Sequence, residues 1–132
     1  MFTNRPALIW SNTKPKTWLM EESQTIPIDG IDQNPIFNVQ GVGYYRVNYD
    51  ETMWLKIADQ LMVEKDRFPA LSRAVIICDV AALARSGHVS QDVAEAVLSF
   101  RDMETDFAPL LAFKECVDES DAIDQEQKNI AN

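Results

Sequence analysis

The sequence has little of what enzyme active sites are commonly built from. It contains one histidine, His88, and two cysteines, Cys78 and Cys116, which stand far apart in the chain. A zinc site with three or four nitrogen and sulfur ligands, or a Cys/His or Ser/His/Asp nucleophile, therefore lacks its parts. Gly41 and Gly43 lie in an expected hairpin rather than in a phosphate-binding loop. The sequence thus predicts no catalytic, cofactor-binding or metal-binding residue.

The sequence also lacks a long hydrophobic run and an excess of basic residues. No stretch approaches the roughly 18 apolar residues that a membrane-spanning helix needs, and the first residues do not resemble a signal peptide. Lys and Arg number 12 against 21 Asp and Glu, a net charge of −9, which argues against binding to nucleic acid. The acidic excess is heaviest over residues 115–126. Such a run is typical of a solvated helical face, with a docking surface for a basic partner as the alternative.

Both cysteines are surrounded by apolar residues at helical spacing. This context favours two buried free thiols over a disulfide or a metal-binding pair. The sequence has no Asn-x-Ser/Thr glycosylation acceptor either. Nothing in these features demands the secretory route, so the cellular compartment stays open.

The first 50 residues are expected to form a β unit. They contain short runs rich in β-branched and aromatic residues, separated by turn residues. The runs are 7–10, 17–20, 25–28, 35–39 and 44–49. Two glycines between the last two runs predict a hairpin over residues 37–49.

From residue 51 onward, apolar residues recur at helical spacing. The expected helices are 51–64, 70–85 and 91–101, a fourth from Thr105 or Asp106 and a weak fifth after Glu119. Asp50 and Ser90 are suited to cap the first and third helices, and Gly87 to end the second in a left-handed conformation. Helices of this length joined by short turns are typical of an α-solenoid.

The transition from the β unit to the helices is a candidate structural junction. Alternation places Tyr45, Val47 and Tyr49 on a packed face and Arg46 on a partly solvated one. We expect Arg46 to form a salt bridge or a cation–π contact that ties the β unit to the helices. Trp54 is expected to be a core anchor near the β unit.

Two charged residues interrupt the apolar second helix. Arg73 and Asp79 are six residues apart, which is about 240° around an ideal helix. A direct pair within the helix is therefore not expected, and each charge needs a partner elsewhere or solvent. The candidate junction residues are Tyr45, Arg46, Val47, Tyr49, Asp50, Trp54, Arg73 and Asp79.

Three linked blocks of sequence carry a family resemblance. They are Gly43-Tyr-Tyr-Arg-Val-Asn-Tyr-Asp50 followed by Trp54, Ser72-Arg-Ala-Val-Ile-Ile-Cys-Asp79 followed by Gly87, and Glu104-Thr-Asp-Phe-Ala-Pro109. In order and spacing they resemble the aminopeptidase N type of the gluzincin zinc aminopeptidases. The matching region is the junction between that family's small β-sandwich domain and its C-terminal helical domain, and it extends here over about residues 6–117.

The resemblance implies an α+β fold. Residues 1–50 would form a partial antiparallel β-sandwich domain, and residues 51–132 the first helices of a solenoid-like α-helical domain. Family members hold zinc with His-Glu-x-x-His plus a later Glu, and they bind the amino end of the substrate with Gly-x-Met-Glu-Asn. This sequence contains neither motif. The chain alone is therefore expected to be no enzyme and to carry no cofactor, whereas its parent would be a zinc metallo-aminopeptidase, a hydrolase.

The resemblance also implies a structural function. As a fragment of such an enzyme, the chain would link the catalytic domain to the helical domain. Its partners would be the remaining domains, and peptide would bind only to the parent. The alternative is a stand-alone interaction module that binds a protein partner through its acidic helical end. An open strand edge or an uncovered apolar face predicts a homo-oligomer when the chain is isolated.

Overall fold

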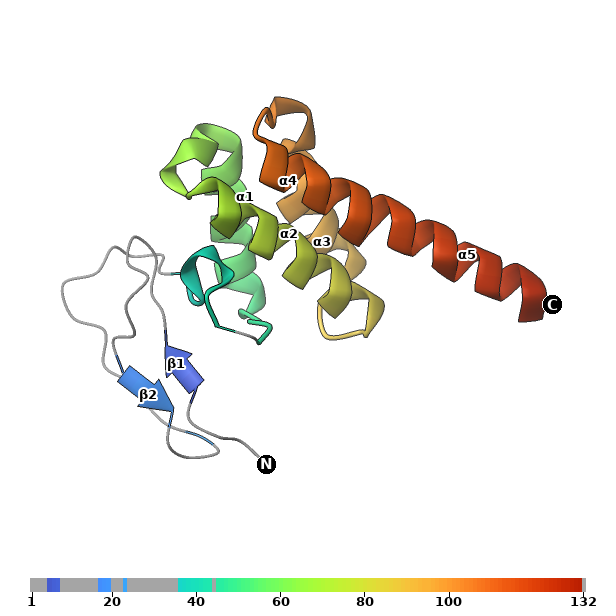
Figure 1. The fold of residues 1–132 in the computed structure, drawn as a ribbon, viewed down its shortest axis with the longest axis horizontal. Helices are drawn as coiled ribbons and strands as arrows, with labels where there is room; N and C mark the ends of the chain where they lie inside the picture. The colour runs from blue at the N-terminus through green and yellow to red at the C-terminus, as the bar shows by residue number, and fades with distance from the viewer. Residues whose placement is uncertain (1–4, 8–16, 20–22, 24–35, 44, 132) are drawn as a thin grey trace.

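The computed structural model describes residues 5–7, 17–19, 23, 36–43 and 45–131, and it shows an array of helices that follows an extended segment (Figure 1). The elements that come first are β1 (Arg5–Ala7), β2 (Thr17–Leu19) and the 3-10 turn η1 (Val39–Gly41). The helices that follow are α1 (Glu51–Glu64), η2 (Lys65–Arg67), α2 (Ala70–Arg85), α3 (Gln91–Leu98), η3 (Ser99–Met103), α4 (Phe107–Ala112), η4 (Phe113–Glu119) and α5 (Ser120–Ala131). Of these, η2 and η3 are 3-10 helices and η4 is a π-helix.

The predicted partial β-sandwich is wrong. Within the described residues the sheet consists of β1 and β2 alone, two antiparallel strands of three residues each. Arg5 lies opposite Leu19 and Ala7 opposite Thr17. The predicted strand at 25–28 lies outside the described residues, as do parts of the other runs. The fold that the structure shows is a helical array rather than α+β.

The predicted hairpin over residues 37–49 is also wrong. Asn38 and Gln40 both have a φ of 57°, in the left-handed region, and this turns the chain into η1 instead of letting it extend. Farther along, the backbone N–H of Val47 donates to the Asp79 carboxylate on α2, at 3.2 Å. Within the described part of the chain, the segment after η1 joins no strand, and its Val47 amide bonds to a carboxylate on a helix instead.

The helices begin and end where local sequence signals predict. Asp50 Oδ1 accepts the backbone N–H of Met53 at 2.7 Å and caps α1. Ser90 Oγ accepts the N–H of Val93 at 3.3 Å and caps α3. Gly87 follows α2 with a φ of 81°. The first two helices keep their predicted bounds, whereas the third is α3 continued by η3.

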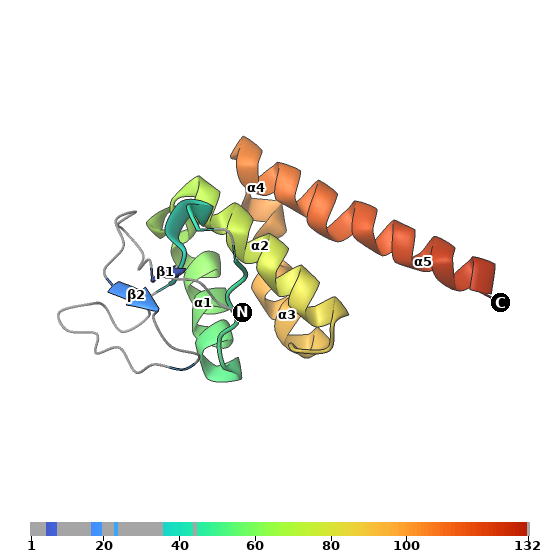
Figure 2. The same cartoon turned by 60° about the horizontal axis from the view of Figure 1, so that its bottom comes forward.

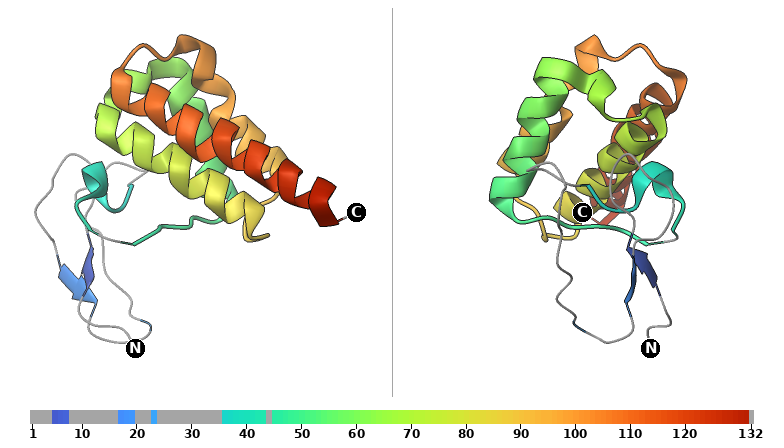
Figure 3. Two further views of the ribbon diagram at one scale, coloured as in Figure 1. Left: turned by 45° about the vertical axis from the view of Figure 1, so that its right-hand side comes forward. Right: turned by 90° about the vertical axis from the view of Figure 1, so that its left-hand side faces the viewer.

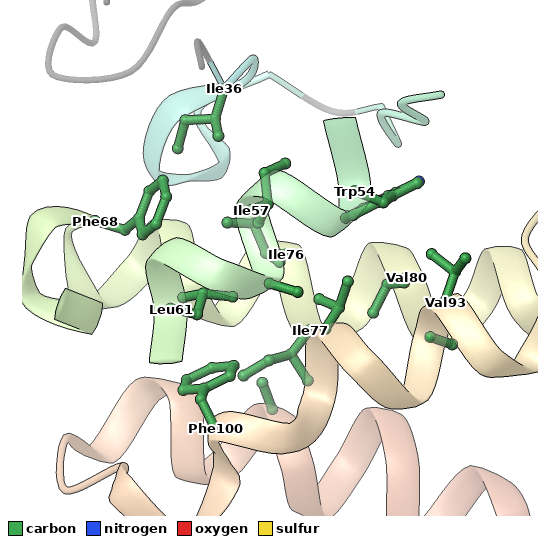
Figure 4. Close-up of a cluster of buried hydrophobic side chains, with 14 of the residues drawn as sticks. Ile36, Trp54, Ile57, Leu61, Phe68, Ile76, Ile77, Val80, Val93 and Phe100 are labelled. Atoms are coloured by element: carbon green, nitrogen blue, oxygen red, sulfur yellow. The ribbon is translucent and has the colours of Figure 1, made fainter. Parts of the chain in front are cut away.

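The helix α2 is at the centre of the array. It contacts α3, α4, η1 and η4, whereas α1 packs mainly on α3. Figure 2 shows neighbouring elements on more than one side of α2. Its buried residues accordingly do not form a single stripe. Figure 4 shows Ile57 and Leu61 of α1 meeting Ile77 of α2 and Phe100 of η3 in the core, and all four side chains are fully buried.

The last helix, α5, extends beyond the rest of the array (Figures 1 and 3). None of its residues is buried. Two of its apolar side chains, Ile123 and Ile130, are 54% and 83% exposed. The helix therefore gains little stability from packing on the domain.

Cys78 and Cys116 form a disulfide, so the expectation of two free thiols is wrong. Cys78 lies on α2 and Cys116 lies on η4, 38 residues later, with the two Cα atoms 5.2 Å apart. Sequence spacing did not reveal the bond because it depends on η4 folding back onto α2. A loop of this length contributes about 4 kcal/mol to stability in the chain-entropy model of disulfides.

Candidate functional site

The junction, which comprises residues 36–43 and 45–50 with α1 and α2, offers structural contacts rather than catalytic groups among these described residues. Among the described residues no three His, Cys, Asp or Glu side chains lie together in a way that could hold a metal ion. His88 Nδ1 is 2.8 Å from Ser86 Oγ, and both cysteines belong to the disulfide. The donors in the described part of the chain therefore do not fit the zinc ion that the resemblance implies for a parent enzyme.

Tyr49 lies between the extended segment and α1. Its hydroxyl oxygen accepts the backbone N–H of Phe37 at 2.9 Å, and its ring meets Trp54 edge to face, with centroids 4.8 Å apart. Trp54 donates its Nε1–H to Asn48 Oδ1 at 2.9 Å, so the polar atom of the buried indole is satisfied. Burial raises the pKa of Tyr49 far above its usual range. The phenol is therefore a neutral hydrogen-bonding group.

Asp79 anchors the extended segment to α2. It is 5% exposed. Its Oδ1 accepts from Arg46 Nη1 and its Oδ2 from the backbone N–H of Val47, both at 3.2 Å. Arg46 Nη1 also donates to the Cys78 carbonyl oxygen at 3.3 Å. Arg46 thus forms a salt bridge, one of the two contacts expected for it.

Burial raises the pKa of the Asp79 carboxyl, and the hydrogen bond from Val47 and the charge of Arg46 oppose that effect. These two effects only partly offset the effect of burial on the Asp79 pKa. The Arg46 side chain is 56% exposed, so water screens its charge. The Asp79 anchor therefore combines a buried acceptor with a largely solvated donor.

Arg73 forms a second, separate cluster of buried charges. It is 2% exposed, and its Nε and Nη2 donate to the two carboxylate oxygens of Glu104 at 2.9 and 3.0 Å. Its Nη2 also donates to Asp106, and its Nη1 donates to the Phe68 carbonyl oxygen at 2.6 Å. The bidentate ion pair with Glu104 fixes the start of α2 against the connection between η3 and α4.

The electrostatics of this cluster keep both central groups charged. Burial alone would raise the pKa of Glu104, but the hydrogen bonds from Arg73 and from the backbone N–H groups of Asp106 and Thr105 outweigh it and hold that pKa below its usual range. Burial would likewise lower the pKa of Arg73, but hydrogen bonds to Glu104 and Asp106 raise it. Removing either partner would leave the other charge buried without its two-point ion pair, with only weaker or more exposed partners such as Asp106 for Arg73 and Lys65 for Glu104.

A groove of about 570 Å³ lies between α2 and the loop that precedes the extended segment. Its floor includes Leu71, Ala74 and Val75 of α2. Asn38 holds the opposite wall, since its Oδ1 accepts the N–H of Gly43 at 2.7 Å. The lining, all within the described residues, contains no histidine and no free thiol, so the groove offers surface for packing rather than for nucleophilic chemistry.

The candidate junction residues do not form one cluster. The Asp79 anchor and the contact between Tyr49 and Trp54 both lie along the extended segment. Tyr45 lines the groove together with Arg46 and Asp79, whereas Arg73 belongs to the separate cluster at the start of α2. The structure therefore brings together only part of the predicted set.

Sequence reasoning missed the roles of Asn38, Glu104 and Asp106. The sequence signal for the two acids was Arg73. This residue is charged, lies in an apolar helix and has no partner within that helix, so it requires an acidic partner from another segment. The signal for Asn38 was its place before two glycines, since Asn tolerates left-handed backbone better than most residues.

Comparisons with known proteins give the chain a context. The model of the ERAP1-like C-terminal domain family matches residues 36–124. The chain is 36% identical over 114 residues to membrane alanyl aminopeptidase of Heliothis virescens, which is 84% of this chain and 11% of that protein. It is 31% identical over 94 residues to the thyrotropin-releasing hormone-degrading ectoenzyme of Mus musculus, 70% of this chain and 9% of that protein. It is 38% identical over 74 residues to aminopeptidase N of Rattus norvegicus, 56% of this chain and 8% of that protein.

The chain thus spans about a tenth of the length of the curated relatives that it matches. Over the described residues, no helix combines the length and the hydrophobicity required to cross a lipid bilayer.

Proposed function

This chain belongs to the ERAP1-like C-terminal domain family, and we propose that it is a non-catalytic structural segment of an aminopeptidase N-type enzyme. In that parent it links the catalytic domain to the helical domain. The observation that carries the proposal is the Asp79 anchor, in which a buried carboxylate holds the side chain of Arg46 and the backbone of Val47 against α2. Such an anchor fixes the direction in which the extended segment enters the helices.

The activity of the parent is part of the same proposal. The relatives bear the names of aminopeptidases and of a hormone-degrading ectoenzyme. The parent would remove N-terminal residues from peptides, and its zinc ion would be held by a His-Glu-x-x-His motif that this sequence lacks. The peptide substrate would bind to the parent, whose other domains are the partners of this segment. The division between the two domains at residue 50 stays a prediction.

The linking role can be tested with the variant Asp79→Ala in the whole chain. We expect the amide of Val47 and the amides of its neighbours to exchange hydrogen with solvent faster, because their acceptor on α2 is gone. Glu95→Ala, an exposed change on α3, is the matched control and should leave this exchange unchanged. If exchange at Val47 were the same in both variants, Asp79 would not anchor the segment.

The absence of activity in the chain itself is tested directly. The purified chain is assayed for bound zinc and for hydrolysis of amino-acid amides. We expect neither stoichiometric zinc nor turnover, because the described donors do not gather around one point. Tight binding of one zinc ion together with turnover would contradict the proposal.

A second candidate function is that of an interaction module, and the exposure of α5 favours it. This helix carries Ile123 and Ile130 on its surface beside several acidic side chains, an arrangement that suits a basic protein partner. The transcript upstream of this sequence separates the two candidates. An in-frame His-Glu-x-x-His supports the structural segment, and a stop codon and promoter directly upstream support the module.

We also propose that the isolated chain associates with copies of itself. The supporting observation is the exposure of large apolar side chains, of which Val63 and Phe107 are 86% and 77% exposed. Light scattering at high protein concentration is the test. A monodisperse monomer would contradict self-association without touching the linking role.

The disulfide supports a proposal on location. Disulfides persist in oxidising compartments and are rare in the cytosol, so we place the segment on the luminal or extracellular side in the parent. Thiol alkylation of the protein from intact cells tests this. Quantitative labelling of Cys78 and Cys116 without added reductant would overturn the assignment.

A further inference from the structure

The helix that leaves the array changes its winding at η4. Residues Phe113–Glu119 form a π-helix between α4 and α5. In a π-helix each backbone N–H bonds to the carbonyl five residues earlier, instead of four as in an α-helix. Such segments are rare because α winding is intrinsically more favourable. Contacts from outside η4 must therefore hold it in this form.

The contacts on one side of η4 involve Arg101. The Phe113 ring lies 5.4 Å from the ring of Phe100 and has the Arg101 guanidinium 5.1 Å from its centroid. Asp118 pairs with the same guanidinium at 2.8 and 2.5 Å. Phe113 and Asp118 are five residues apart, which is about 140° around an α-helix. In the wider π-helix, residues five apart lie on nearly the same side of the helix axis. This winding therefore allows both Phe113 and Asp118 to face Arg101.

The contacts on the opposite side include a covalent bond. Cys116 of η4 is joined to Cys78 of α2 by the disulfide. Arg85, at the end of α2, donates from Nη1 to the Cys116 carbonyl oxygen at 2.9 Å. The π-helix is thus fixed to α2 at the same residue by its side chain and by its backbone.

These restraints are unequal. The side chains of Arg101 and Asp118 are 45% and 48% exposed, so water and salt weaken their attraction. The hydrogen bond from Arg85 to Cys116 is exposed as well. The disulfide does not depend on exposure or on salt. Together with the packing of the buried Phe113 ring, it is therefore a restraint on the winding of η4 that water and salt do not weaken.

We propose that the disulfide between Cys78 and Cys116 is a redox-sensitive device that holds η4 in π winding and so sets the orientation of α5. When a dithiol opens the bond, η4 returns to α winding. A π-helix accommodates one residue more than the same turns of an α-helix. When η4 becomes α-helical, that extra residue shifts into α5, and α5 turns about its axis by about 100°, the angle of one α-helical residue. The exposed side chains Ile123 and Ile130 then point in a new direction.

The chemistry is thiol–disulfide exchange with a small dithiol. One thiolate of the dithiol attacks a sulfur of the disulfide, forms a mixed disulfide and releases the other cysteine as a thiolate. The second thiol of the reductant then displaces the first cysteine and closes a cyclic disulfide. Two electrons and two protons pass to Cys78 and Cys116. Both cysteines are half-buried, and Cys78 lines the groove beside α2, which is the side from which a small reductant would approach.

The winding can be read by nuclear magnetic resonance on the whole labelled chain. Scalar couplings across hydrogen bonds identify the carbonyl that accepts each amide proton. In the oxidised chain we expect the amide of Asp118 to couple to the carbonyl of Phe113, five residues earlier. After addition of dithiothreitol we expect it to couple to the carbonyl of Lys114, four residues earlier, while residual dipolar couplings report a reoriented α5.

Two variants sharpen the test. The double variant Cys78→Ser, Cys116→Ser should show the four-residue pattern with and without dithiothreitol. The matched control Arg101→Gln removes the ion pair on the opposite side of η4. It should keep the five-residue pattern when oxidised and still respond to dithiothreitol.

Two results would overturn the proposal. The first is a folded double variant that keeps the five-residue pattern and the original direction of α5. The second is cooperative loss of the whole helical signal in far-ultraviolet circular dichroism, in the double variant and in the reduced wild type alike. In that case the disulfide holds the entire fold together and does not act on α5 alone.

Discussion

The two ends of the helical array are held by different kinds of contact. At the junction end, charged side chains are buried and paired, since Arg73 and Asp79 are 2% and 5% exposed and each has fixed partners. At the η4 and α5 end, an exposed ion pair and a disulfide hold the helix, and no residue of α5 is buried. The first end therefore depends on complete pairing of buried charges, whereas the second depends on a disulfide and on the buried Phe113 ring.

The largest effect is expected from Glu104→Ala. This change leaves the Arg73 guanidinium buried without its main partner, which costs about 3–5 kcal/mol of unfolding free energy. Urea denaturation measures it. Glu115→Ala, an exposed change in η4, is the control and should shift stability by less than about 0.5 kcal/mol. Equal effects of the two changes would remove the distinction between the two ends.

The second largest effect is expected from Trp54→Ala, which should lower the free energy of unfolding by about 3 kcal/mol. This value is toward the lower end for aromatic-to-alanine changes in protein cores, because the half-buried Tyr49 ring can move into part of the cavity. Tyr45→Ala should cost about 1 kcal/mol or less, since Tyr45 is only partly buried at the groove. Thermal melts of both variants provide the measurement. A larger loss for Tyr45 than for Trp54 would place the organising core at the groove instead.

The double variant Cys78→Ser, Cys116→Ser should lower stability by about 2–3 kcal/mol. The value lies below the full chain-entropy term because unfolded chains keep some residual structure. Hydrogen exchange at the Asp79 anchor should hardly change, because its partners are untouched. Faster exchange at Val47 in this variant would show that the two ends are coupled.

Acid should weaken the junction end through Glu104. Its folded pKa lies below its unfolded value, so its contribution is fully present above the unfolded pKa of about 4.3 and is lost as pH falls through the lowered folded pKa. Asp79 acts in the opposite sense, because its raised folded pKa makes its contribution fall as pH rises through that value. Stability of wild type and of Glu104→Gln, measured from pH 7 to pH 2, checks the sign. We expect the variant to show the shallower loss below about pH 4.3.

The smallest effect is expected from Arg101→Gln. An exposed ion pair contributes about 0.2–1 kcal/mol, and added salt screens even that. Melting of this variant at low and high salt is the measurement. A loss comparable to that of Glu104→Ala, unchanged by salt, would mean that the η4 end also relies on charge pairing.

Local sequence signals were sufficient to predict the helices, and the order of sequence blocks was sufficient to indicate the family. Asp50 and Gly87 mark the start of α1 and the end of α2 because a capping hydrogen bond and a left-handed turn act over only a few residues. The order and spacing of three sequence blocks also indicated the aminopeptidase N type. The helix ends thus depend on neighbouring residues, and the family on the linear order of the blocks, so neither requires knowledge of contacts between distant segments.

The contacts between distant segments, in contrast, depend on the packed fold. Cys78 and Cys116 meet across 38 residues because η4 folds back onto α2, and Arg73 finds Glu104 31 residues away. This dependence on distant contacts also explains why the predicted partial β-sandwich was wrong. An extended run such as the one around Val47 can pair its backbone with a strand or with a helix-borne carboxylate, and only the packed fold selects the second.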